Sequence, residues 1–121
     1  MNNDDFEQLV VDALESLPPE FVRYLENVEV IVERRPTGEH RRRVGLKPWQ
    51  SLYGLYEGVP LTRRNHFGVH VPDTIILFQE PLERDFPTAS ALRKQVQRTV
   101  LHEIAHLFGI SDARLRELGA Y

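Results

Sequence analysis

The chain predicts an α+β domain, in which a small sheet packs on helices. Three observations carry this prediction. Residues 88–108 have helical periodicity and contain no Gly or Pro. Residues 27–33 and 74–79 have instead the patterns of strands. The length of 121 residues is that of a single domain, which we expect to span residues 1–121.

The N-terminal part predicts two helices and a strand. Residues 4–16 begin with acidic side chains, which the helix dipole favours there. Their apolar side chains recur at helical spacing: Phe6, Leu9, Val10, Ala13, Leu14 and Leu17. Pro18 and Pro19 end this helix, and residues 19–25 predict a short helix or turn. Residues 27–33 alternate as a strand does, with one valine side (Val28, Val30, Val32) and one clearly polar side (Glu29, Ile31, Glu33).

Residues 34–48 form the basic part of the chain. They contain one acid, Glu39, and six cations: Arg34, Arg35, Arg41, Arg42, Arg43 and Lys47. A contact with nucleic acid or with an acidic substrate is one interpretation. A charge run alone is weak evidence, so we expect a solvated surface loop. The net charge of −3 does not favour nucleic-acid binding either.

The middle of the chain predicts two further strands. Residues 51–56 have the pattern of a short strand that runs into a turn. Residues 61–72 are a polar loop whose histidines, His66 and His70, have no ligand spacing, so we expect no site role for them. Residues 74–79 are a compact apolar run between prolines and predict a central strand. A loop over residues 81–87 then leads to the long helix.

The predicted helix over residues 88–108 has two distinct sides. Thr88 or Ser90 is placed to cap its start. At about 100° per residue, one side holds Gln95, Thr99, His102, Glu103 and His106, and the other holds Leu101, Ile104 and Phe108, which we expect to face a core. Gly109 stands where a helix end favours a left-handed residue. A final short helix is expected over residues 112–118.

Residues His102 to His106 fit the pattern H-E-x-x-H, and Gly109 and Asp112 extend it to H-E-x-x-H-x-x-G-x-x-D. Two imidazoles four residues apart on a helix lie on one face and can bind one tetrahedral zinc ion. Glu103 is then placed to act on a metal-bound water. Asp112 is the candidate third ligand, because a catalytic zinc site usually needs three protein donors.

Plainer interpretations of these residues stay open. His102 and His106 could be ordinary partly buried histidines beside a surface Glu103. Asp112, with Ser111, could simply cap the last helix, although one carboxylate can both cap and bind a metal. Two histidines and a carboxylate also hold iron or other divalent ions, so the choice of zinc depends on the motif.

Composition restricts the class of protein further. The chain contains no cysteine, so it has neither a disulfide nor a thiolate metal ligand, as is usual in the cytoplasm. Its first residues are polar and acidic, unlike a secretory signal. No run of 18 apolar residues is present to span a membrane. We therefore expect a cytoplasmic protein that does not enter a membrane.

The chain resembles the small bacterial zincin-like metallopeptidase family, which has a minimal zincin fold. The resemblance covers roughly residues 5–121 and rests on three segments: SLYGLYEGVPLTRR, PDTIILFQEPLE and QVQRTVLHEIAHLFGISDARLRELGAY. It implies a small mixed sheet packed against the N-terminal helix and the long helix that carries the motif. It also implies a peptide or protein substrate, whose backbone pairs with an edge strand; Leu52–Tyr56 or Ile75–Phe78 are the candidates.

The resemblance also implies the roles of the motif residues. His102, His106 and Asp112 match the zinc ligands, Glu103 matches the general base, and Gly109 matches the turn glycine. The chain departs from the metzincins, which have histidine as the third ligand and a methionine-containing turn. The only methionine here is Met1.

Two functions from different classes follow. The first is a zinc-dependent peptidase, in which the oxyanion is stabilised by one of several candidates: Tyr53, Tyr56, His70, Arg114 and Tyr121. The second is a non-catalytic zinc-containing module that binds a peptide or protein. Glu103 favours the enzyme, because a structural zinc site does not need that carboxylate and usually closes with a fourth protein ligand.

Overall fold

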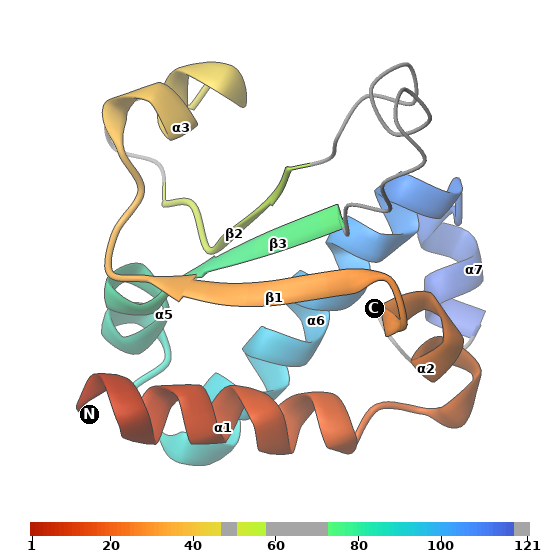
Figure 1. The fold of residues 1–121 in the computed structure, drawn as a ribbon, viewed down its shortest axis with the longest axis horizontal. Helices are drawn as coiled ribbons and strands as arrows, with labels where there is room; N and C mark the ends of the chain where they lie inside the picture. The colour runs from red at the N-terminus through yellow and green to blue at the C-terminus, as the bar shows by residue number, and fades with distance from the viewer. Residues whose placement is uncertain (47–50, 58–72, 118–121) are drawn as a thin grey trace, which may run out of the picture.

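The computed structural model describes residues 1–46, 51–57 and 73–117, except for the side chains of His106 and Asp112. Figure 1 shows the elements in chain order. The helices are α1 (Asn3–Glu15), α2 (Pro19–Leu25), α3 (Gly38–Arg43), α5 (Gln79–Asp85), α6 (Ala89–Phe108) and α7 (Asp112–Glu117). The strands are β1 (Val28–Glu33), β2 (Gly54–Glu57) and β3 (Asp73–Phe78).

The three strands form one mixed sheet in the order β1-β3-β2. Strand β3 is central, as its apolar run predicted. It pairs in parallel with β1, where Val30 is opposite Ile75, and antiparallel with β2, where Tyr56 is opposite Ile75. Together with the helices this sheet confirms the predicted α+β fold, and it leaves β2 at an edge beside α6.

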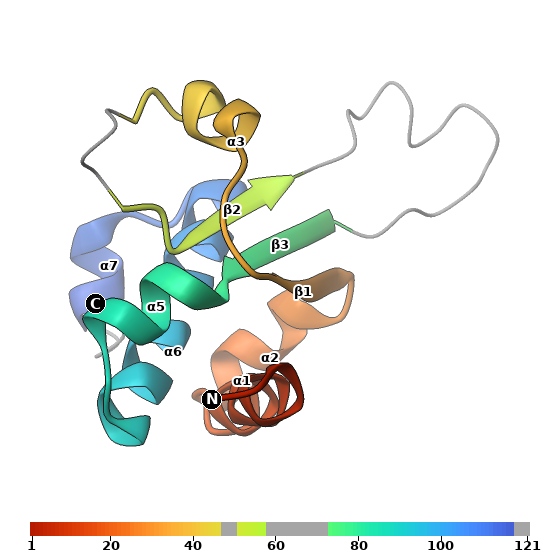
Figure 2. The ribbon, with the colours of Figure 1, turned by 90° about the vertical axis from the view of Figure 1, so that its left-hand side faces the viewer.

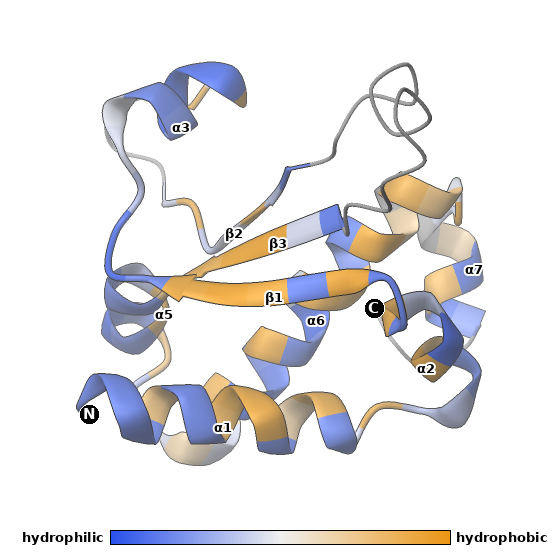
Figure 3. Ribbon diagram, viewed as in Figure 1, coloured by the Kyte–Doolittle hydropathy of each residue, from blue (hydrophilic) through white to orange (hydrophobic). Residues whose placement is uncertain are grey.

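Helices α1 and α6 cover one face of the sheet (Figures 1 and 2). The valine side of β1 packs against this core, as the alternation predicted. The buried side chains come from α1, β3, α5 and α6: Phe6, Leu9, Val10, Ala13, Ile75, Leu77, Leu82, Leu92, Val96, Val100 and Ile104. Figure 3 shows hydrophobic residues along much of β1 and β3. Burying a large apolar side chain stabilises the fold by roughly 1.5–3 kcal/mol, so this core fixes α6 against the sheet.

The opposite face of the sheet carries a smaller apolar cluster. Leu55, Ile76 and Phe78 are buried there, and Ile31 packs against them. The prediction of a polar side for β1 is therefore wrong at Ile31. The imidazole of His40 in α3 lies over this cluster, 5.3 Å from the ring of Phe78 between centroids. Helix α3 therefore covers the face that the alternation predicted to be polar.

Helix α3 lies inside the segment that we expected to be a loop, so that prediction is wrong for Gly38–Arg43. Its start is stabilised by a reciprocal cap: the Thr37 hydroxyl accepts from the His40 amide and the His40 ring accepts from the Thr37 amide, both at 3.1 Å. At its end Arg43 donates to Glu57 of β2 at 2.7 Å. This bond ties α3 to the edge strand.

Helix α5 replaces most of the loop that we expected over residues 81–87. The prolines led to the wrong prediction, because Pro81 lies in the first turn of α5. A proline is tolerated in a first turn, where the backbone N–H has no partner within the helix.

The predicted helix at the N-terminus, the short helix over Pro19–Leu25 and the three strands are confirmed, with ends shifted by up to three residues. The predicted loop histidines His66 and His70 lie outside the described residues. In the three described ranges, no helix has the length and apolar character to cross a membrane.

Candidate active site

Helix α6 carries the H-E-x-x-H motif, and both of its ends are fixed. Thr88, one of the two predicted caps, accepts from the Ala91 amide at 3.2 Å. At the other end Gly109 has a φ of 70°, the left-handed conformation that we predicted. The Ile110 amide then donates to the Ala105 carbonyl at 2.8 Å, the long bond of a Schellman turn. The chain therefore turns back directly after the motif.

The two sides of α6 are largely as predicted. Leu101 and Ile104 are buried, whereas His102 and Glu103 are half-buried on the other side. The prediction that Phe108 faces the core is wrong, because its side chain is 49% exposed. Its ring packs on the ring of Tyr24, with centroids 4.8 Å apart, because the last turn of α6 extends beyond the sheet to α2.

Helix α7 packs back against α6. Leu115 is fully buried in a cluster with Leu101 and Ala105 of α6. The Ser111 hydroxyl accepts from the Arg114 amide at 3.1 Å, so Ser111 supplies a cap at the start of α7. Asp112 is the first residue of α7 and follows the turn at Gly109.

The residues predicted to bind metal lie on two neighbouring elements. His102 and His106 are four residues apart on α6, and such pairs have Cβ atoms roughly 5–6 Å apart. The side chains of His106 and Asp112 lie outside those that the structure describes. Among the described side chains, no three His, Cys, Asp or Glu residues gather as a metal site does. The donor types, two imidazoles and a carboxylate, fit zinc, whose usual ligands they are.

Strand β2 approaches α6 closely near Glu103. A Cβ atom added at Gly54 would lie 2.5 Å from the Cγ2 atom of Thr99 and 3.2 Å from the carbonyl oxygen of Ile76. Thr99 is itself buried and accepts a hydrogen bond from Gln95 at 3.2 Å. Only glycine fits at position 54 without a shift of the strand or the helix.

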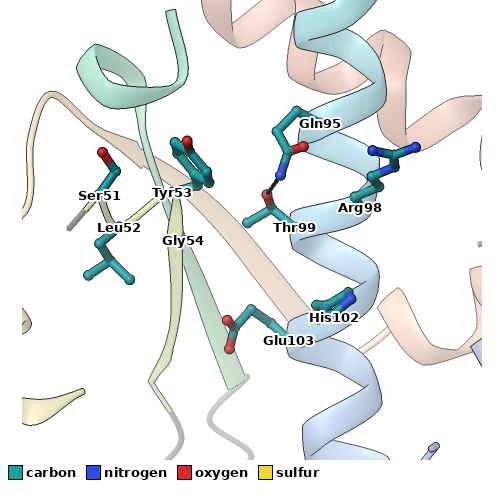
Figure 4. A pocket seen from close by; sticks show the side chains of 9 residues that line it. All are labelled: Ser51, Leu52, Tyr53, Gly54, Gln95, Arg98, Thr99, His102 and Glu103. Carbon is teal, nitrogen blue, oxygen red and sulfur yellow. Dashed lines mark hydrogen bonds between the residues drawn. The ribbon is translucent and has the colours of Figure 1, made fainter. Parts of the chain in front are cut away.

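Glu103 reaches from α6 toward β2 (Figure 4). Its Oε2 atom accepts a hydrogen bond from the backbone N–H of Tyr56 at 3.2 Å. Tyr56 is two residues after Gly54, and Glu103 is one helical turn after Thr99. The close approach of Gly54 to Thr99 therefore brings the Tyr56 N–H and the Glu103 carboxylate together. The carboxylate is thereby held at the edge strand, beside His102.

The geometry decides between the two candidate edge strands. Within the described residues, β2 pairs only with β3. Its Tyr56 N–H donates to Glu103 of α6, so α6 lies beside this edge strand. Strand β3 has neighbours on both sides, so the candidate Ile75–Phe78 is wrong. The candidate Leu52–Tyr56 overlaps β2 and lies beside the motif.

A cavity of about 470 Å³ lies between α6 and the chain leading into β2 (Figure 4). One wall comes from Ser51–Gly54 and the other from α6, whose lining residues are Gln95, Arg98, Thr99, His102 and Glu103. The cavity therefore includes the predicted base and one predicted ligand, and it continues along α6 toward its N-terminus.

Two tyrosine hydroxyls that were candidates for the oxyanion are already bonded to carboxylates. Tyr53 donates to Asp85 at 2.6 Å, and Tyr56 donates to Asp73 at 2.8 Å. Burial and the bond to Asp85 raise the pKa of Tyr53 to about 12. The bonds from Arg84 and Tyr53 lower the pKa of Asp85 to about 2. These contacts fix the cavity wall instead of presenting a free donor.

Of the remaining oxyanion candidates, Arg114 is the one that lies within the described residues. Arg114 donates to Glu117 at 2.9 Å. His70 and Tyr121 lie outside the described residues.

Three features of the site were missed in the sequence. Gly54 carries a signal, since an isolated glycine within a strand pattern often marks a close backbone approach. Arg98 lies one helical turn before His102 and was therefore visible in the periodicity. The contact between Glu103 and the Tyr56 backbone has no signal in the sequence, because it depends on tertiary packing.

The model of a family described as zincin-like metallopeptidase matches residues 25–120, which include all of β1–β3, α6 and α7. A comparison with curated proteins finds no match.

Proposed function

The chain belongs to the zincin-like metallopeptidase family, and on this premise we propose that it is a zinc-dependent peptidase. In this proposal His102, His106 and Asp112 hold the metal. Glu103 is the general base, and the substrate is a peptide or protein that lies along the cavity between β2 and α6. The observation that carries the proposal is the position of Glu103, held at the edge strand by the Tyr56 amide at 3.2 Å and next to His102.

The chemistry divides between the metal and the chain. Bound zinc supplies a Lewis acid that polarises a carbonyl group and lowers the pKa of a coordinated water to about 7. Glu103 accepts a proton from the attacking water and delivers it to the leaving amine. The hydrogen bond from Tyr56 keeps the carboxylate aimed into the cavity during this exchange.

Strand β2 has a second role in the proposal. An extended peptide that adds to the outer edge of a sheet gains main-chain hydrogen bonds. Strand β2 is such an edge, and it runs past Glu103. A peptide bound there would present successive backbone groups to the base.

Ser111 supports the assignment of Asp112. The plainer interpretation was that Asp112 caps the last helix, but the Ser111 hydroxyl makes a capping bond with the Arg114 amide. The start of α7 therefore has a cap that does not require Asp112. Its carboxylate is the nearest donor in the sequence after the turn at Gly109.

The test is peptide hydrolysis by Glu103→Gln beside the wild type. The amide oxygen of Gln can still accept from the Tyr56 N–H, so the fold is kept while the base is lost. We expect zinc content to be unchanged and turnover of a casein digest to fall by about 10²–10⁴-fold. Equal cleavage by both proteins would refute the peptidase. Zinc binding without cleavage by the wild type would instead favour the non-catalytic binding module.

A further inference from the structure

The cavity extends beyond the residues that the proposed chemistry uses. From Glu103 and His102 it follows α6 toward its N-terminus, past Thr99 and Arg98 to Gln95. On an α-helix four residues rise about 6 Å, so Arg98 lies one turn from His102. Figure 4 shows Arg98 and His102 on neighbouring turns of α6.

Within the described residues, Arg98 has no carboxylate partner, unlike five other arginines. Arg34, Arg35, Arg43, Arg84 and Arg114 each form an ion pair. Arg98 makes no hydrogen bond or ion pair with the part of the chain that the structure describes. It is exposed and lines the cavity. Figure 4 shows its side chain leaving α6 on the side away from β2, so the guanidinium lies at the rim of the cavity. A guanidinium at this rim can form paired hydrogen bonds with a carboxylate.

Helix α6 itself is basic around Arg98. The first half of α6 contains Arg93, Lys94 and Arg98 but no acid before Glu103. Lys94, Arg98, His102 and His106 follow one another at four-residue intervals and so lie along one stripe of the helix. This local positive potential stands out in a chain whose net charge is −3.

We propose that Arg98 forms a subsite for a carboxylate group of the substrate, within about two residues of the cleaved bond. The inference rests on the proposed peptidase function. An extended peptide advances about 3.3 Å per residue, and the turn from His102 to Arg98 rises about 6 Å. An acidic side chain and a free C-terminus both supply the carboxylate.

The first experiment profiles cleavage of a mixed peptide library by mass spectrometry. We expect the wild type to favour bonds with Asp, Glu or a free C-terminus within two residues, by about threefold to tenfold. Arg98→Gln should bring the ratio of cleavage at acidic sites to cleavage at neutral sites down to about one. Arg93→Gln is the matched control, because Arg93 is an exposed arginine of α6 that is not in the cavity lining. A preference that survives Arg98→Gln, or that Arg93→Gln removes equally, would overturn the subsite.

The second experiment measures binding without turnover and separates the two carboxylate sources. Fluorescent peptides that differ only in Glu against Gln, or in a free against an amidated C-terminus, are titrated into Glu103→Gln with Arg98 intact or changed to Gln. The peptide pair in which removing the negative charge weakens binding more shows whether an acidic side chain or a free C-terminus supplies the carboxylate. No difference between the charged and neutral peptides would overturn the proposal. Carboxylate-dependent binding with no cleavage of any library peptide would refute the peptidase and leave the subsite standing.

Discussion

At the scale of single residues, the site depends on where one carboxylate is held. Glu103 follows the first histidine of the motif, and the Tyr56 amide fixes its orientation at 3.2 Å. A glutamate on a helix surface would otherwise sample many rotamers. The edge strand therefore supplies the orientation that the motif alone does not.

Gly54 gives the first test of this arrangement. In Gly54→Ala the new methyl would lie 2.5 Å from Thr99 Cγ2, so β2 and α6 must move apart. We expect unfolding free energy to fall by about 1–3 kcal/mol and peptidase activity to fall with it. Urea unfolding and a cleavage assay measure the two effects.

Two variants control for this change. Thr99→Ser removes the opposing methyl but keeps the hydroxyl that Gln95 contacts, so it should restore much of the loss in Gly54→Ala. Gly38→Ala meets only the flexible end of Arg42, at 3.3 Å, and should change stability by less than about 0.5 kcal/mol. If Thr99→Ser restores no stability to Gly54→Ala, the contact between the new methyl and Thr99 Cγ2 is not the cause of the lost stability.

Asp85 gives a prediction about pH. Its bonds to Arg84 and Tyr53 lower its pKa from 3.8 to about 2. Because the folded-state pKa is lowered, the carboxylate stabilises the fold above about pH 4, and this contribution is lost as the pH falls toward 2. Asp85→Asn should therefore be less stable than the wild type at pH 6, with the difference vanishing near pH 2. A constant difference from pH 6 to pH 2 in urea unfolding would contradict the pairing.

At the scale of elements, the turn after α6 directs α7 back toward the motif. Gly109 has a φ of 70°, and Leu115 of α7 is buried against α6. An L-residue in this conformation costs roughly 1–2 kcal/mol. Gly109→Ala should lose about that stability and also weaken zinc binding, because Asp112 follows the turn.

Gly45→Ala is the matched control for the turn. Gly45 has the same φ of 70° and open space around its Cβ position, but it follows α3. We expect a similar loss of stability with unchanged zinc affinity, measured by competition with a chelating dye. Equal zinc affinity in both variants would mean that the turn at Gly109 does not position a ligand.

The elements also show what a sequence can predict. Helix α6, its Thr88 cap and the turn at Gly109 were predictable, because periodicity and end residues are local signals. Helix α5 was missed because Pro81, in its first turn, and Pro87, after its end, suggested a loop. Helix α3 was missed because its cap uses the His40 ring in place of a carboxylate. The contact between Tyr56 and Glu103 joins residues 47 positions apart, so no local pattern reports it.

At the scale of the whole molecule, the helices and the sheet share one principal core. Side chains from α1, β3, α5 and α6 meet in it. We propose that residues 1–121 form a single domain. The expected result is one cooperative unfolding transition, with the same midpoint by circular dichroism and by Trp49 fluorescence. Two separate transitions would contradict this.

Metal binding should stabilise that whole unit. A ligand that binds only the folded chain adds about 2.7 kcal/mol when present at 100 times its Kd. Added zinc should therefore raise the melting temperature of the wild type, and a chelator should reverse the shift. In His102→Ala, neither zinc nor the chelator should change the melting temperature. Arg93→Gln is the control on the same helix, outside the cavity lining, and it should respond to both as the wild type does.

The zinc content of protein purified without a metal-affinity tag tests the central claim most directly. Elemental analysis should find about one zinc per chain in the wild type. The ion should be lost in His106→Ala and strongly reduced in Asp112→Ala, while Glu103→Gln keeps it. A wild-type chain that contains no zinc and takes up none when it is added would contradict the metal site, and the proposed peptidase with it.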